Sequence, residues 1–264
     1  MRARLATVAI AASLAACAGP VVRPTVSPST PNGDALLVLP GFGYGRTDDK
    51  AFRSLAASTA GAGVDLYVAD YLTRSGLATS RVKLERFVRE NRLARYQRLH
   101  VFAFIAGAWT LNPVVEGNQL PNLVSVIYDR SPFQERAPRV AAAKLPFLAW
   151  LRYGTTLFDV AKSPYTALTA PNVKIALMVE ARPTSFIRRY AEAAGRDGPF
   201  AFECDSFLQR YDDCLYLPMN HDELYPRFAE VWPELITFIR TGRFSDAANR
   251  TPPTDDPLGR RRPQ

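Results

Sequence analysis

Short apolar runs alternate with amphipathic stretches along most of the chain. The apolar runs have the length and composition of buried strands: Ala35–Leu39, Val64–Ala69, Leu99–Ile105, Leu123–Tyr128, Val173–Val179 and Cys214–Leu217. Residues 48–60 and 79–93 between them read as helices. The clearest helix is Tyr225–Arg240, whose apolar residues recur at helical spacing: Phe228, Val231, Trp232, Leu235, Ile236 and Ile239.

This alternation predicts an α/β fold, in which a mostly parallel sheet is covered by helices on both faces. We expect one domain over residues 34–243. An aromatic, proline-interrupted segment, residues 144–170, lies between two predicted strands and is expected to form a small helical cap. Such a cap would cover the carboxyl edge of the sheet, where ligands bind in open α/β folds.

The first sixteen residues have the pattern of a secretory signal peptide. Arg2 and Arg4 precede an apolar run over residues 5–14, which is too short to span a bilayer as a helix. Leu14-Ala15-Ala16-Cys17 at its end resembles the lipobox of bacterial lipoproteins. This resemblance implies cleavage before Cys17 and fatty acylation of Cys17, with palmitate-type chains, in the cell envelope. Because Ala18 rather than Asp follows Cys17, the outer membrane is favoured over the inner membrane.

Two of the three cysteines remain if Cys17 carries lipid. An exported chain meets an oxidising compartment, so Cys204 and Cys214 are expected to form a disulfide. The alternative is two free, buried thiols.

The flanks of the predicted domain differ from it in composition. Residues 17–33 are rich in Pro, Ser, Thr and Val and are expected to be a flexible tether. Residues 244–264 contain several Pro and Asp and the run Arg260-Arg261-Arg262, and are expected to be disordered.

The net charge of the chain excludes few classes of binding partner. The full chain carries a net charge of +8, and loss of Arg2 and Arg4 with the signal peptide leaves 31 basic and 25 acidic residues, or +6. We expect contact with a membrane, through lipid on Cys17, and with a ligand or envelope protein of unknown identity, and no nucleic-acid partner. No cofactor is expected, because the sequence has neither a Cys/His cluster with metal-ligand spacing nor a glycine-rich phosphate loop.

Three segments in the predicted domain resemble the α/β-hydrolase family. Leu36 to Gly43 is similar to the strand and the loop that supplies one oxyanion-hole amide, with Pro40 where His is usual. Leu99–Ala108 resembles the strand and nucleophile elbow, and residues 217–221 end in His221, at the usual place of the catalytic His. The resemblance implies oxyanion-hole-like positions at Gly41, Phe42 and Ala106.

The chain departs from this family at the nucleophile. The family pattern G-x-S-x-G aligns with Ala103 to Gly107, which places Ile105 at the position of the Ser. Ile has no heteroatom that could attack a carbonyl, and its branched Cβ disfavours the positive φ of the elbow. An ordinary buried strand that runs into a helix is the alternative interpretation of this segment.

The base and acid positions are better preserved. His221 is the candidate base, and Asp129 after the fourth predicted strand is the candidate acid, since Glu180 to Pro183 after the next strand contains no Asp. Asp129-Arg130 is equally interpretable as a salt-bridged strand end. His100 lies at a strand start and is expected to be structural.

We therefore expect a membrane-anchored, nucleophile-less hydrolase-like protein that binds a ligand or partner without catalysis. The alternative is an esterase or lipase acting on esters or related acyl substrates with a nonstandard nucleophile, such as Ser75, Ser131 or Ser206. A variant is acid–base chemistry by His221 and Asp129 alone. A third hypothesis is an envelope protein with only a structural role.

Overall fold

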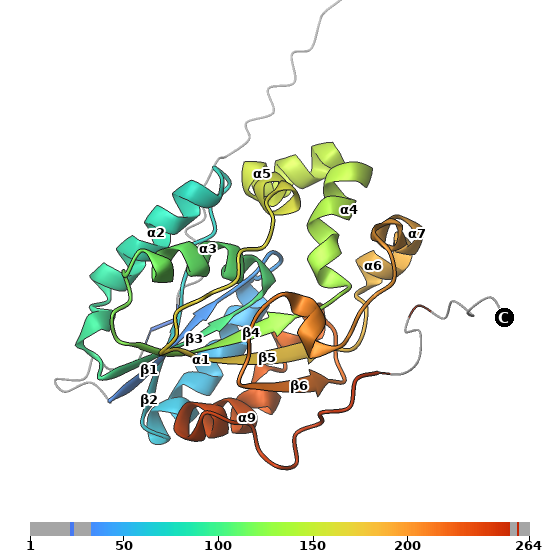
Figure 1. Ribbon diagram of the computed structural model, residues 1–264. Coiled ribbons are helices and arrows are strands. Elements are labelled where there is room, and N and C mark those ends of the chain that lie inside the picture. The colour runs from blue at the N-terminus through green and yellow to red at the C-terminus, as the bar shows by residue number, and fades with distance from the viewer. Residues whose placement is uncertain (1–21, 24–32, 254–257, 259–264) are drawn as a thin grey trace, which may run out of the picture.

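The computed structural model describes residues 22–23, 33–253 and 258 of the 264 residues. Six strands form one parallel sheet in the order β2-β1-β3-β4-β5-β6 (Figure 1). The strands are β1 Asp34–Leu39, β2 Val64–Val68, β3 Arg98–Ala103, β4 Leu123–Arg130, β5 Lys174–Glu180 and β6 Asp213–Leu217. The expected α/β fold is confirmed, and each predicted strand corresponds to an observed one.

Helices cover both faces of the sheet. The α-helices are α1 Arg46–Gly61, α2 Leu77–Glu90, α3 Ile105–Glu116, α4 Ala137–Lys144, α5 Pro146–Lys162, α6 Ser185–Arg189, α7 Ala191–Ala194, α8 His221–Leu224 and α9 Phe228–Thr241. Short 3-10 turns lie at Leu93–Arg95, Gln134–Arg136, Gly195–Asp197 and Cys204–Phe207. Within the described part of the chain, none of the helices is long and apolar enough to cross a membrane.

Successive side chains of the central strands point to opposite faces of the sheet, so the core consists of two layers. Leu37 and Leu39 of β1 belong to a cluster shared with α2 and α3 on one face, and Leu36 and Val38 to a cluster shared with α1 and α9 on the other. The apolar strands predicted from the sequence are buried on both sides for this reason.

Helices α4 and α5 occupy the connection from β4 to β5 and stand together on one side of the sheet (Figure 1). The helical segment begins at Ala137, earlier than the cap expected from residue 144. The segment up to Lys144 is a second helix whose Val140 is buried in the core.

The disulfide between Cys204 and Cys214 is present, with the two Cα atoms 6.6 Å apart. It ties the 3-10 turn that contains Cys204 to the edge strand β6. Closing a loop of this size stabilises the fold by about 3 kcal/mol in the chain-entropy model.

Both flanks are more structured than their composition predicts. Val22 is 1% exposed and pairs with Val68 at the end of β2, so the expected tether over residues 17–33 is fixed to the domain at this point. Phe244 is buried and packs on Phe238, and Arg250 forms an ion pair with Asp213 at 2.9 Å. The expectation of disorder is therefore wrong for residues 244–250, because one buried aromatic ring and one ion pair hold them. Cys17 and the signal peptide lie outside the described residues.

Candidate functional site

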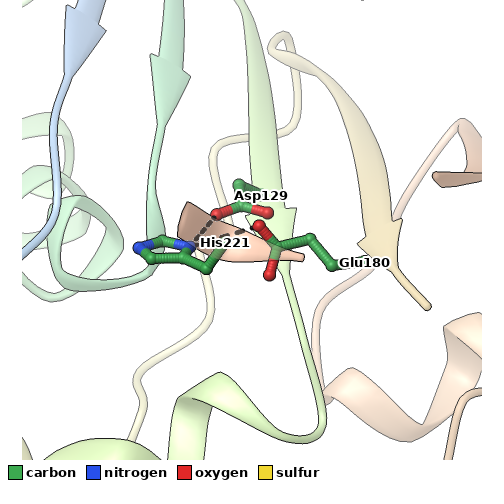
Figure 2. A group of neighbouring side chains, drawn as sticks. All are labelled: Asp129, Glu180 and His221. Atoms are coloured by element: carbon green, nitrogen blue, oxygen red, sulfur yellow. Dashed lines mark hydrogen bonds and ion pairs between the residues drawn. The ribbon is translucent and has the colours of Figure 1, made fainter. Parts of the chain in front are cut away.

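The carboxyl edge of the sheet brings one histidine and two carboxylates together (Figure 2). Asp129 is near the end of β4, Glu180 ends β5, and His221 begins α8 after β6. His221 Nδ1 lies 3.0 Å from Asp129 Oδ2 and 3.2 Å from Glu180 Oε1. The parallel sheet causes this convergence, because its strands all end at the same edge.

Asp129 contacts His221 rather than a neighbouring arginine. Successive residues of a strand point to opposite faces, and Arg130 accordingly pairs with Glu135 at 2.5 Å, away from Asp129. The interpretation of Asp129-Arg130 as a salt-bridged strand end is therefore wrong for Asp129.

Glu180 is a site residue that the sequence analysis missed. It occupies the strand end that usually carries the acid in α/β-hydrolases, although the residue there is Glu and not Asp. The signal was available, because Glu serves as the triad acid in this fold as well as Asp.

His221 is held in its charged form. Burial alone would lower its pKa, but the carboxylates of Glu180 and Asp129 outweigh burial and raise the pKa to about 10. Burial, together with the charge of Asp129, raises the pKa of Glu180 well above its ordinary value. The raised pKa of His221 therefore favours an imidazolium ion beside the two carboxyl groups at neutral pH.

The other ring nitrogen of His221 faces a tyrosine. Tyr225 Oη lies 3.4 Å from His221 Nε2 and accepts a hydrogen bond from the Gly41 amide at 2.8 Å. The ring of Tyr225 stacks on Phe104 at 4.2 Å between centroids. A Cβ at Gly41 would lie 3.0 Å from Tyr225 Oη and 3.4 Å from His221 Nε2, so this packing favours glycine at residue 41.

The segment that aligns with the nucleophile elbow has an ordinary backbone. Phe104 has φ −63° and ψ 161°. The apolar run predicted Ile105 as the last residue of a strand, but Ile105 is the first residue of α3. Residues 104–106 are absent from the positive-φ positions found in the described part of the chain. The strained turn that exposes the nucleophile in α/β-hydrolases is therefore replaced here by an unstrained backbone. Gly107 remains necessary, because a Cβ there would lie 2.9 Å from the Leu39 carbonyl oxygen.

The candidate hydroxyl nucleophiles are directed elsewhere. Ser131 Oγ accepts a hydrogen bond from the Gln134 amide, and Ser206 Oγ donates to the Glu203 carbonyl. Ser75 is exposed in the loop before α2. Among the described residues, Tyr225 provides the only hydroxyl hydrogen-bonded to His221. His100, at the start of β3, is buried and bonded to Ser125 Oγ at 2.7 Å, which agrees with its expected structural role.

The ligand atoms of Asp129, Glu180 and His221 lie within 4.8 Å of one another, as they would around a metal ion. Both carboxylates, however, point at the same ring nitrogen at hydrogen-bond distance. The Nδ1 nitrogen is within hydrogen-bonding distance of Glu180 Oε1 and forms an ion pair with Asp129, whose two oxygens have no hydrogen-bond donor among the described residues.

A cavity of about 310 Å³ opens beside the cluster. Its volume is at the lower end of the usual range for small-molecule sites. His221, Ile105 and Ala106 line it, together with apolar side chains of α4 and α5 that include Pro138, Ala141, Leu157 and Val160. A second cleft of about 470 Å³ adjoins it and shares the lining residues Phe42, Gly43, Arg152 and Tyr153.

The buried cluster predicts a pH dependence of stability. An unfolded histidine has a pKa near 6.5, so between about pH 7 and pH 9 the folded state binds a proton that the unfolded state lacks. The free energy of unfolding should fall as the pH rises through this range, by up to about 1.4 kcal/mol per pH unit. Urea unfolding at several pH values and constant ionic strength measures this slope.

Glu180→Gln is the matched control for this prediction. It removes the charge that most raises the pKa of His221 and should flatten the slope. Equal slopes in the two proteins would mean that the cluster does not hold the extra proton.

Comparison with known proteins adds evidence for the fold. No protein-family model matches the chain, and no curated protein matches its sequence. Est1E from Butyrivibrio proteoclasticus superposes with a TM-score of 0.50 at 12% identity, over 83% of this chain and 90% of that one. The chain has an α/β-hydrolase-like fold. The propeptide form of the Bacillus licheniformis lipase BlEst2 superposes with a TM-score of 0.55 at 12% identity, over 88% of this chain but only 55% of that one. This chain thus spans about half the length of that lipase form.

Proposed function

We propose that this protein is a membrane-anchored binding protein, in which an α/β-hydrolase-like domain holds a small, mainly apolar ligand without catalysis. The observation that carries the proposal is the position of Tyr225 Oη, which contacts both the Gly41 amide and His221 Nε2. In an acyl-transfer enzyme, an amide at this place binds the developing oxyanion, and the histidine takes the proton of the nucleophile. In this protein the hydroxyl of Tyr225 contacts both of these groups, the Gly41 amide and His221 Nε2.

Two further features support the absence of catalysis. Ile105 at the nucleophile position has no attacking atom, and the raised pKa of His221 favours its protonated form, which is not a base. The cavity beneath α4 and α5 remains, and its apolar wall favours the hydrocarbon part of a ligand.

The second candidate is an esterase-type hydrolase. Two carboxylates orient His221, and this arrangement resembles the acid and base of a catalytic triad. Such an enzyme would need its nucleophile from Tyr225 or from a serine that moves. Fluorophosphonate labelling of the purified protein separates the two candidates. We expect no labelled residue, and labelling that maps to any Ser or Tyr of the chain would favour the hydrolase.

The membrane anchor rests on the lipobox-like Leu14 to Cys17. We expect Cys17→Ser to prevent processing and acylation, because acyl transfer needs the thiol. Mass spectrometry of the N-terminal peptide measures this: the wild type should carry acyl groups on Cys17, and the variant none. A wild-type N-terminal peptide without acyl groups would contradict the anchor.

A further inference from the structure

The first half of α5 exposes four large apolar side chains. Phe147, Leu148, Trp150 and Leu151 are 69%, 56%, 51% and 53% exposed. They lie within five consecutive residues, and only Ala149 between them is buried. We call these four side chains the α5 apolar patch. Contiguous apolar patches on a monomer commonly mark an interaction surface.

The patch is held in place rather than frayed. Helix α5 is interrupted at Gly154, whose φ is 64°, and a Cβ there would collide with the Arg74 carbonyl group. Beyond this point Thr155 N donates to Arg74 O at 2.9 Å, and Asp159 accepts from the Leu77 amide at 3.0 Å. These bonds fix the second half of α5 to the loop before α2, so the first half projects from a rigid base.

The charges next to the patch are mainly basic. Residues 137–158, which cover α4 and most of α5, contain Arg139, Lys144 and Arg152 and no acidic residue. Arg139 forms an ion pair with Asp197 at 3.1 Å, and the acidic residue of α5, Asp159, lies in its second half and accepts from the Leu77 amide. Arg74 adds a further cation, with its guanidinium 6.0 Å from the centre of the Trp150 ring. Aromatic and aliphatic side chains bordered by cations are typical of surfaces that lie in the interface of an anionic membrane.

The point at which the N-terminal segment joins the domain, Val22, lies at the carboxyl edge of the sheet. Val22 pairs antiparallel with Val68, the last residue of β2, which places Val22 at this edge. Four residues lie between Cys17 and Val22, and the five residue-to-residue steps span at most about 17 Å. A lipid on Cys17 would therefore keep the carboxyl edge, and the cap helices beside it, close to the bilayer.

We propose that the α5 apolar patch docks onto the anionic lipid surface to which the protein is tethered. The proposal rests on the membrane anchor of the proposed function and specifies how the domain is oriented on it. Arg152, Tyr153, Leu157 and Val160 of the same helix line the 310 Å³ cavity. Docking through α5 therefore brings a wall of the ligand cavity to the membrane, and the ligand class that fits is a membrane-derived amphiphile with a hydrocarbon chain.

Tryptophan quenching by brominated lipid tests the docking. The full-length protein is purified from membranes and reconstituted into vesicles of phosphatidylethanolamine and phosphatidylglycerol whose acyl chains carry bromine. The chain has three Trp residues, Trp109, Trp150 and Trp232. We expect the emission to be quenched, and Trp150→Phe, which keeps an aromatic ring at the interface, to lose most of that quenching. Lys144→Gln combined with Arg152→Gln should weaken the quenching, as should added salt.

The outcomes separate docking from anchoring. Mass spectrometry of the N-terminal peptide reports acylation of Cys17 independently of fluorescence. Acylated protein in which Trp150 is not quenched would overturn the docking and leave the anchor intact. Non-acylated protein that is still quenched through Trp150 when mixed with vesicles would support the docking without the anchor. Absence of quenching combined with a dimer that Leu148→Ser and Leu151→Ser dissociate would assign the patch to self-association, and would also overturn the proposal.

Discussion

Ile105→Ser is expected to show no esterase turnover above that of Ile105→Ala, although it restores the missing hydroxyl. Catalysis requires the nucleophile, the base and the oxyanion donors in mutual reach. In this protein the Gly41 amide already donates to Tyr225 Oη, and His221 is protonated with its Nε2 facing the same hydroxyl. A serine at residue 105 would therefore find neither a base nor a vacant oxyanion hole.

The backbone adds a second barrier to this reaction. The elbow normally aims the amide after the nucleophile at the developing charge, and that amide here belongs to Ala106 in a relaxed helix start. Misplacement of a catalytic group by about 1 Å can lower the rate about 100-fold. Hydrolysis of short p-nitrophenyl esters and fluorophosphonate labelling, both on proteins shown to be folded, measure the outcome.

Tyr225→Phe combined with Ile105→Ser identifies which barrier dominates. The substitution removes only the hydroxyl and keeps the stacking on Phe104. Turnover that appears in the double variant alone would assign the block to Tyr225. Robust turnover by Ile105→Ser alone would contradict the interpretation, and would show that only the nucleophile has been lost.

The strands were predictable because each is apolar on both faces, so that even short runs such as Val64–Val68 stand out from the amphipathic segments. The start of α3 was not predictable in the same way. Residues 99–108 are apolar without a break, and periodicity alone does not separate a buried strand from a buried helix. The helix begins at Ile105 because the Phe104 amide makes the last bond to β1, at Leu39, and the Phe104 carbonyl oxygen accepts from the amides of Gly107 and Ala108.

The candidate site was predicted in part for a related reason. His221 and Asp129 could be placed at one edge because both follow strands. The role of Tyr225 could not be predicted, because it lies in the amphipathic sequence before α9 and is indistinguishable there from a core aromatic residue. Its contact with Gly41 joins residues 184 positions apart, and only the packed fold creates it.

His221→Leu is expected to destabilise the fold by about 3–5 kcal/mol, the usual cost of removing one partner from a buried ion pair. Asp129 and Glu180 are both 0% exposed, and His221 supplies the cation that lies between them. Within the described part of the chain, both oxygens of Asp129 and Oε2 of Glu180 have no hydrogen-bond donor, so the leucine would leave two carboxyl groups in contact without compensation. Urea unfolding followed by circular dichroism at pH 7 measures the loss.

A compensated variant tests whether charge, rather than the shape of the imidazole, causes this loss. In the triple variant Asp129→Asn, Glu180→Gln, His221→Leu, the two amides are neutral and can hydrogen-bond to each other, so most of the lost stability should return. If His221→Leu alone costs less than about 1 kcal/mol, which is the average effect of a point substitution, the cluster does not carry a buried ion pair. If the triple variant is no more stable than His221→Leu, packing of the imidazole against Phe104 and Tyr225 is the cause instead.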